Sequence, residues 1–542
     1  MRALRALARG SIIGLALLLA PHRLPAQNAA ETPQYHVSTH LVQFGVIARS
    51  KDGPVPSLTK NDFLVFDRDR PRILSVFLAE PIAPAAPPPA ALPPDTFTNE
   101  SRYLGDVPET VTLVLLDNLN TIFGSDPQPY EDTPLWLEDH ALGMAKQRLL
   151  DFLRHMDPRD RVAIYGLTGQ LRVLCDFTCS RDQLLAVVSA YDASSKTARE
   201  SAYPRNFHLP NVPEAFNQAI DRDTRELASI NNERRASLTL AAMTAISQHL
   251  ADLPGRKNLL WLTADLPASG DAIAAVLAHA NIVAYPVDAR ALLPTAPVIT
   301  VSTDDPFQGR DVSAPLGHAS VPPGQTAMLE MAADTGGHAF LNSNDLTSAI
   351  RQVVEDSAAT YTLGFYIPEH EVDGRFHRIR VEVKEPGLTL TCPRGYFAFR
   401  DSGSSDDDRH SALLAAMRSP LASSALPLDV HLARIEQPPH ALQMVGVAGI
   451  GAVRFDQQGT FHIGTLNIYA VEQDTAGNVL DQLNQPMLLH LSDQEYRGYL
   501  KSGILFRAVI ALKPEATVLR VLVQDAGSAQ VGCVIVPLDQ VK

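Results

Sequence analysis

The chain has 542 residues, too many for one hydrophobic core, which predicts three or four domains of about 100–200 residues each. Hydrophobic residues make up 45% and charged residues 20% of the chain, which excludes wholesale disorder, while 40 prolines indicate stiff linkers and irregular loops. The formal net charge of -14 disfavours nucleic-acid binding and favours cations or basic partner surfaces.

Residues 1–26 have the three parts of a secretory signal peptide: arginines at the start, an apolar run over residues 12–20, and a small-residue end at Ala26. The apolar run is far shorter than the roughly 20 residues that span a bilayer. We therefore expect cleavage after Ala26 and no integral membrane anchor in the mature protein. Cleavage removes four arginines and no acids, so the formal charge moves from -14 to -18. The predicted location is periplasmic or extracellular.

The chain contains four cysteines, at positions Cys175, Cys179, Cys392 and Cys533. Export permits disulfides, and the first two are close enough in sequence to bridge across a turn. Two unpaired thiols are the alternative, and the sequence leaves the choice open. No second closely spaced Cys or His pair accompanies them, so a zinc site is not expected.

Residues 27–80 predict a small β unit, because apolar and polar residues alternate over 41–46 and short apolar runs follow at 63–66 and 73–77. Residues 81–103 are rich in proline and alanine and predict a stiff, extended linker that cannot pack a core.

Residues 104–357 alternate between predicted strands and helices, which is typical of a sheet covered by helices on both faces. The predicted strand at 111–116 is apolar apart from Thr112, as expected of a strand buried on both sides. The other predicted strands are 161–167 and 170–175, which form an edge hairpin, then 258–263, 281–287 and 338–341. Helices are predicted near 142–156, 180–191, 236–253, 271–280 and 326–334, with a polar loop before the third.

Residues 358–400 form a predicted β-rich extension that could pair with the N-terminal unit. His370 and His377 flank a predicted hairpin there, and we expect both in a solvent-exposed turn rather than a catalytic site. Residues 401–415 are rich in Ser and Asp and predict a second linker. Residues 416–542 contain short strands separated by turn signals and predict a C-terminal β-sandwich.

The order of the predicted elements resembles the von Willebrand factor A fold, a Rossmann-like α/β sheet. Six short segments, spread over residues 35–399, are similar to the acidobacterial-type VWFA-related proteins. These segments are Leu58-Thr59-Lys60-Asn61-Asp62-Phe63, Leu115-Leu116-Asp117-Asn118-Leu119-Asn120-Thr121, Pro254-Gly255-Arg256-Lys257-Asn258-Leu259-Leu260-Trp261, Tyr285-Pro286-Val287-Asp288, Thr335-Gly336-Gly337 and Gly364-Phe365-Tyr366.

The resemblance implies a metal-ion-dependent adhesion site at the top of the sheet, where a D-x-S-x-S loop, a threonine and an aspartate hold Mg²⁺ or Ca²⁺. Hard cations take oxygen ligands, and loops at strand ends can converge on one point. The candidate ligands are Asp117, Asn120, Thr121, Thr239 and Asp265, with Ser237 as an alternative to Thr239.

The match to that loop pattern is partial. Leu119 replaces the middle serine and cannot bind a metal, and Asp265 stands one residue later than the pattern requires. The alternative is that Asp117 hydrogen-bonds loop amides and that Asp265 caps the next helix. Cation binding and a metal-free loop therefore both remain open.

No nucleophile elbow, phosphate-binding loop or zinc-protease helix occurs in usable sequence context, so we do not expect an enzyme. The favoured function is an exported protein-binding or adhesion protein whose α/β domain presents its upper loops to a protein ligand. A structural envelope scaffold without metal or regulated ligand is the alternative. An extracellular hydrolase is the least favoured, because no carboxylate pair can be placed at a defined separation.

Overall fold

The computed structural model describes residues 39–51, 53–79, 92–100, 111–120, 146–147, 149–156, 161–191, 214–251, 253, 256–263, 265–266, 270–288, 323–341, 351, 353, 360–398, 405–528 and 530–541. The chain divides into two units, Met1–Ser38 and Thr39–Lys542, and all described residues belong to the second. The predicted signal peptide lies outside the described residues, as does the candidate ligand Thr121. Over the described ranges, no helix is both long and apolar enough to cross a membrane.

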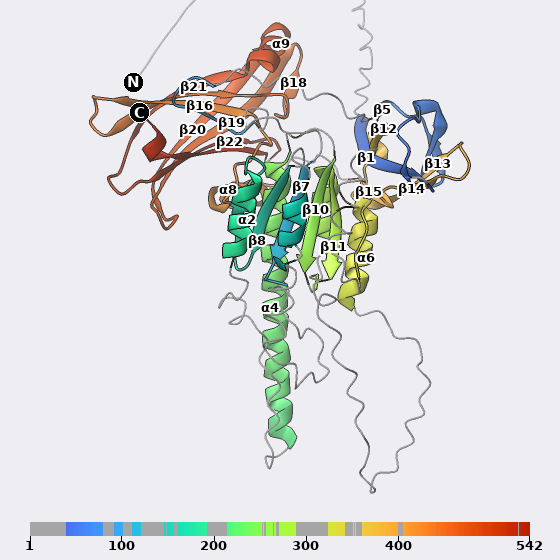
Figure 1. Cartoon of the computed structure of the whole chain (residues 1–542). Helices are drawn as coiled ribbons and strands as arrows, with labels where there is room; N and C mark the ends of the chain where they lie inside the picture. Colours follow the sequence, from blue (N-terminus) through green and yellow to red (C-terminus); the bar gives the residue numbers. More distant parts are fainter. Residues whose placement is uncertain are drawn as a thin grey trace, which may run out of the picture. The chain divides into compact units, whose positions relative to one another are not determined.

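A five-stranded mixed sheet forms the centre of the α/β part, in the order β11-β10-β7-β8-β9 (Figure 1). Its strands are β7 (Val111–Asp117), β8 (Val162–Leu167), β9 (Leu171–Cys175), β10 (Lys257–Thr263) and β11 (Ile282–Asp288). All neighbours run parallel except β9, which pairs antiparallel with β8 at one edge. Where residues 338–341 were expected to form a strand, one isolated parallel bridge joins Phe340 to Val287. The parallel strands are buried along their whole length, as their apolar runs predict.

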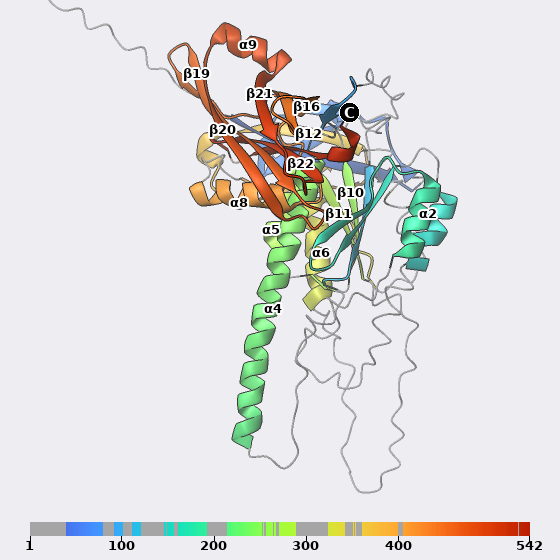
Figure 2. The same cartoon turned by 90° about the vertical axis from the view of Figure 1, so that its left-hand side faces the viewer.

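Helices cover both faces of this sheet (Figures 1 and 2). They are α2 (Arg181–Ala190), α4 (Glu214–His249), α5 (Gly270–His279) and α6 (Pro323–Thr335). One hydrophobic cluster joins α4, α5 and α6 to one face of the sheet, and a second joins α2 and helical residues 149–155 to the other. The described helices therefore lie between the strands, where the alternating pattern predicts them.

Helix α4 begins 22 residues before the expected start at Ala236, so part of the predicted polar loop is helical. Residues 214–235 contain no glycine or proline to end a helix. Several side chains of this first part are exposed, including Arg222, Glu226 and Ile230. Exposed positions such as these need not be apolar, so this part of the helix lacks the apolar periodicity from which the helix start was predicted.

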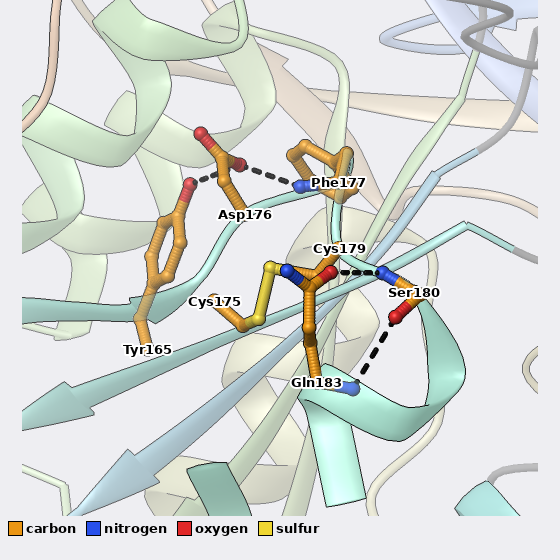
Figure 3. The surroundings of a disulfide bond; sticks show 7 residues. All are labelled: Tyr165, Cys175, Asp176, Phe177, Cys179, Ser180 and Gln183. Atoms are coloured by element: carbon orange, nitrogen blue, oxygen red, sulfur yellow. Dashed lines mark hydrogen bonds between the residues drawn. A yellow bond between two sulfur atoms is a disulfide. The ribbon is translucent and has the colours of Figure 1, made fainter. Parts of the chain in front are cut away.

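A disulfide joins Cys175 and Cys179 at the end of the edge hairpin (Figure 3). This answers the question that the sequence left open. Directly after it, the Ser180 side chain accepts a hydrogen bond from the Gln183 amide and begins α2 with a capping box. The two remaining cysteines, Cys392 and Cys533, are free thiols.

The N-terminal β unit and residues 360–398 fold together. One sheet has the order β14-β1-β12-β5, with β2 (Gly53–Pro54) beside β1, and a second has the order β15-β13-β3-β4. Their strands are β1 (Thr39–Ser50), β3 (Phe63–Asp67), β4 (Arg70–Arg72), β5 (Val76–Ala79), β12 (Thr360–Pro368), β13 (Phe376–Val383), β14 (Thr389–Thr391) and β15 (Gly395–Phe397). Both sheets contribute to one hydrophobic cluster. Strands from either side of the α/β part thus share one core.

His377 corrects an expectation, because it is buried on β13 with only 1% of its surface exposed. Its Nε2 lies 3.0 Å from the Asp373 carboxylate and its Nδ1 lies 3.0 Å from the Tyr396 hydroxyl. The hairpin prediction placed His377 at the turn, but the alternation of β13 turns this side chain inward. His370 is exposed, as expected.

Two sheets make up the C-terminal part, in the orders β21-β17-β16-β6 and β18-β19-β22-β23, with β20 pairing β19. Their strands are β6 (Thr96–Thr98), β16 (Leu428–Ile435), β17 (Ala441–Ala448), β18 (Asp456–Gln458), β19 (Phe461–Gln473), β20 (Val479–Ser492), β21 (Ile504–Ala511), β22 (Val518–Asp525) and β23 (Val531–Pro537). Residues of both sheets form one hydrophobic cluster. Helix α9 (Asp493–Ser502) connects β20 to β21.

Both predicted linkers differ from expectation. Strand β6 lies inside the Pro/Ala-rich segment and pairs with β16, because Thr96, Phe97 and Thr98 supply strand-forming residues at its end. Helix α8 (Asp406–Arg418) occupies most of the Ser/Asp-rich segment. Its first residues are acidic, which suits the positive end of the helix dipole, and Leu413 and Ala416 pack against the second sheet.

Candidate functional site

The candidate site lies at the carboxyl ends of the parallel strands. Asp117, Thr263 and Asp288 are the last residues of β7, β10 and β11, and all three are buried. When the five strands are numbered in chain order, their order across the sheet from β9 to β11 is 3-2-1-4-5. The chain therefore runs from β7 toward one edge of the sheet, and then returns to the other side of β7 and runs toward the opposite edge. The carboxyl ends of β7 and β10 therefore flank the point at which the order reverses.

The Asp117 carboxylate accepts several hydrogen bonds in this position. The Asn120 backbone N–H donates to Oδ1 over 3.0 Å, and the Asn120 Nδ2 group donates to Oδ2 over 2.9 Å. The Trp261 Nε1–H donates to Oδ2 over 2.8 Å. Complete burial raises the pKa of Asp117, while hydrogen bonds from Asn120, Trp261 and Thr263 oppose that effect. The two N–H groups of Asn120, the Trp261 indole and Thr263 together use the roughly four acceptor positions of the Asp117 carboxylate.

Asn120 links the β7 loop to helix α4. Its Nδ2 group also donates to the Thr239 Oγ1 over 2.9 Å, so one amide nitrogen holds both Asp117 and Thr239. The opposite amide orientation would place two acceptor oxygens against each other, which disfavours it. The Asn120 Oδ1 is buried without a hydrogen-bond partner among the described residues. Thr239 is fully buried and Ser237 is exposed, so the structure separates the two candidates.

Asp265 is engaged elsewhere. Its Oδ1 accepts a hydrogen bond from the Leu266 amide over 2.9 Å, and its Oδ2 lies 3.5 Å from a nitrogen of Arg235. The structure thus brings together Asp117, Asn120 and Thr239, whereas Asp265 pairs with a residue of α4.

These residues do not fit a bound cation as they are arranged. The Asn120 Nδ2 group occupies the position between the Asp117 and Thr239 oxygens at which a shared cation would lie, and an N–H donor repels a cation. Leu119 is buried in the hydrophobic core and offers no ligand atom. Across the described ranges, no group of three or more His, Cys, Asp or Glu side chains is placed to hold a metal ion. The expectation of a Mg²⁺ or Ca²⁺ site is not supported by this geometry.

Two residues of the site, Trp261 and Asp288, were not identified from the sequence. Trp261 belongs to a buried strand, so its indole N–H gave no sign of a role in the site. Asp288 accepts a hydrogen bond from the Gln325 amide of α6 over 2.8 Å. Asp288 ends an apolar strand just as Asp117 does, and that shared pattern is the signal that could have identified it.

Comparison with known proteins gives no close relative. No family model matches the chain, and neither does any curated protein. Among solved structures, an aerotolerance-related membrane protein from Bacteroides fragilis is 15% identical with a TM-score of 0.24, and the match covers 45% of this chain and 97% of that one. BatB from Bacteroides thetaiotaomicron is 16% identical with a TM-score of 0.24, covering 46% and 98% of the two chains.

Proximal thread matrix protein 1 from the mussel byssus is 10% identical with a TM-score of 0.23. That match covers 51% of this chain and 48% of the mussel chain, about half of its length. Another structure of the mussel protein is described with a zinc-occupied MIDAS motif. All these TM-scores lie near 0.2, so the likenesses carry no argument about the present chain.

Proposed function

We propose that this chain is an exported binding protein. Its α/β part is a von Willebrand factor A-like domain, nearest to the acidobacterial-type group, and its C-terminal part is a β-sandwich. The domain presents the loops at the carboxyl edge of its sheet to a protein partner. The proposal assigns no catalytic activity to the chain, and it locates the protein in the periplasm or outside the cell.

One observation carries the proposal: the hydrogen-bonded network of Asp117, Asn120 and Thr239 lies where the strand order reverses. Open α/β sheets bind ligands outside the carboxyl ends of their strands at this point. Burying polar groups is costly unless they are paired, and here the hydrogen bonds among these residues fix the start of the loop that follows β7. Fixing the first residues of a loop reduces the entropy that the loop loses when it binds a partner.

The proposal includes no resident cation. The Asn120 amide links Asp117 to Thr239 directly, which supports a metal-free version of the adhesion site. Calorimetric titration of the protein lacking residues 1–26 with magnesium, calcium and manganese tests this part. Heat from a saturable site that disappears in Asp117→Asn would overturn the metal-free version and leave the binding role in place.

The binding role is tested by capturing proteins from envelope and secreted fractions with three tagged forms: the wild type, Asn120→Ala and Asp182→Asn. Asp182 is exposed at the start of α2, so its substitution is the matched control. We expect one or more partners that bind the wild type and Asp182→Asn but are lost with Asn120→Ala. Capture of the same proteins by all three forms would contradict recognition by the loop face.

A structural envelope scaffold is the second candidate, and the pairing of β1 with β12 over nine residue pairs favours it. The Ser424 hydroxyl adds hydrogen bonds of 3.0 and 2.9 Å to the backbone oxygens of Gln248 and His249 in α4. A scaffold needs such rigid connections and no specific loop. It predicts that Asn120→Ala changes stability but leaves every captured partner unchanged.

A further inference from the structure

The sheet of β6, β16, β17 and β21 in the C-terminal part has an exposed outer face. Inward side chains of β16, β17 and β21 form the sandwich core, and the alternation of each strand turns every second residue outward. In the other sheet of the sandwich, α8 packs on the outer face through Leu413 and Ala416. Figure 1 shows α8 beside β22, away from β16 and β21. Positions that α8 covers in one sheet therefore have exposed counterparts in the other.

Several outward side chains of this exposed face are apolar. Leu505 and Val509 on β21 are 51% and 54% exposed. Leu505 lies opposite Val447 in the register of the sheet, and Val445 is the next outward residue of β17. Both valines are partly exposed. Apolar surface carried by neighbouring strands, rather than by scattered single residues, is typical of a protein–protein contact.

Two charged side chains on this face, Arg507 and Asp429, form no ion pair or side-chain hydrogen bond within the part of the chain that the structure describes. Arg507 is exposed at the outward position between Leu505 and Val509. Asp429 lies on β16, opposite Val447, and its Oδ1 is buried. A buried carboxylate oxygen without a donor costs free energy. A contact that supplies a donor to Asp429 would remove that cost.

A face that carries one acid and one base in this state is complementary to itself. A two-fold axis that lies between two copies of the face, midway between the two positions, brings Arg507 of each copy onto Asp429 of the other. A partner surface of a single charge sign would bury either Arg507 or Asp429 against a like charge, which is unfavourable. The charges therefore favour a second copy of the chain over a uniformly acidic or basic partner.

We propose that this sheet face is the contact between two copies of the chain. Arg507 of each copy pairs with Asp429 of the other, and the outward Leu and Val side chains of β17 and β21 pack around these pairs. The face spans about 14 Å across its four strands and about 27 Å along β21, or roughly 400 Å². Stable interfaces bury about 800 Å² per partner, so we expect a reversible dimer that dissociates in the micromolar range. This contact is independent of the protein-binding role proposed above.

The test is sedimentation equilibrium of the chain lacking residues 1–26 at about 1–300 μM. We expect the average mass to rise with concentration from that of one chain toward that of two. Leu505→Asp should weaken association about tenfold or more, because it places a charge inside the apolar contact. Leu488→Asp is the matched control, since Leu488 is 75% exposed on β20 in the other sheet. Its association should stay within about twofold of the wild type.

Mixing two single variants tests the two-fold pairing itself. Arg507→Glu and Asp429→Lys should each be monomeric alone, because each places like charges opposite one another. An equimolar mixture of the two variants should dimerise, since the mixed dimer contains one exchanged acid–base pair and one original pair. Melting temperatures show whether each variant is folded. If Asp429→Lys does not fold, the comparison of Leu505→Asp with Leu488→Asp carries the test.

Three results would overturn the proposal. The first is a wild type that stays monomeric at the highest concentration, which would leave the face to a different protein. The second is a Leu488→Asp variant that associates as weakly as Leu505→Asp. The third is a mixture of folded Arg507→Glu and Asp429→Lys that remains monomeric.

Discussion

The Asn120 side chain links two elements of the α/β part, the loop after β7 and helix α4. Its Nδ2 group donates to Asp117 and Thr239 at 2.9 Å each. A cation would attract the same two oxygens, but the amide does so without charge and without depending on ion concentration. The Asn120 amide nitrogen therefore joins the Asp117 carboxylate to the Thr239 hydroxyl.

Asn120→Asp tests this interpretation at the level of that atom. The substitution replaces the donor by an oxygen next to the buried Asp117 carboxylate, and we expect a loss of about 2–4 kcal/mol in the free energy of unfolding at neutral pH. Millimolar Ca²⁺ should raise the melting temperature of this variant, because three oxygens then face one another, and should leave the wild type unchanged. Differential scanning fluorimetry with and without EDTA measures both effects.

The control for this substitution is Asn484→Asp, at an exposed position of β20. It makes the same chemical change away from any buried carboxylate, so its stability should change by less than about 0.5 kcal/mol. A wild-type melting temperature that rises saturably with Ca²⁺ would show that the natural site holds a cation.

At the scale of elements, Asp176 connects the edge hairpin to α4. Its carboxylate accepts a hydrogen bond from the Tyr165 hydroxyl over 3.0 Å and from the Phe177 amide over 2.9 Å, both drawn in Figure 3. Its other oxygen lies 3.3 Å from the His249 Nε2. Burial acts to raise the pKa of Asp176, but the hydrogen bonds and the His249 charge outweigh it, so the pKa is lowered.

A lowered carboxyl pKa gives a definite pH dependence. The folded state binds this proton less readily than the unfolded state, whose carboxyl pKa is near 4. The stability that the Asp176 charge contributes is therefore complete above about pH 5 and is lost as the pH falls through the folded pKa. We expect the stability difference between the wild type and Asp176→Asn to shrink between about pH 5 and pH 3 in urea unfolding. A difference that grows in acid would contradict the assignment.

The disulfide between Cys175 and Cys179 closes a short loop around Asp176. Chain-entropy arguments give about 2 kcal/mol of stabilisation for a loop this short. The double variant Cys175→Ser with Cys179→Ser should lose about this amount in urea unfolding.

Reductant provides the control for the disulfide prediction. It should destabilise the wild type but have no effect on the double variant. Burial raises the pKa of the Cys392 thiol to about 11, so this cysteine stays protonated at neutral pH and is a poor nucleophile for exchange. Cys392→Ser should therefore respond to reductant like the wild type. An equal response of all three proteins would contradict the assignment.

At the scale of the whole molecule, segments distant in sequence complete each other's cores. β1 pairs with β12, and Phe44, Phe63 and Phe365 belong to one hydrophobic cluster. In the same way β6 joins the C-terminal sheet through β16. The α/β part is therefore flanked by strands whose pairing partners lie on its other side in the sequence.

Removal of residues 27–80 tests this dependence. The deletion strips β12 and β13 of their partners β1 and β3 and uncovers the apolar side chains of that cluster. We expect strong binding of the dye ANS and aggregation, since exposed strand edges and apolar patches promote association. Removal of residues 27–38 alone, which precede β1, is the control and should leave dye binding low. A soluble, cooperatively unfolding product of the longer deletion would show that the extension folds without the N-terminal strands.

The sequence by itself predicted the five strands of the central sheet, because a run such as residues 111–116, apolar apart from Thr112, is typical of a strand buried on both faces. It also placed Asp117 at the end of that strand. Only the tertiary structure showed which residues surround Asp117, namely Trp261 and, through Asn120, Thr239. The tertiary structure also showed that His377 is buried, and that β6 and α8 lie within the two predicted linkers. The physical reason is the same in each case: local pattern fixes which way the backbone runs, whereas burial and hydrogen bonding depend on partners far away in the chain.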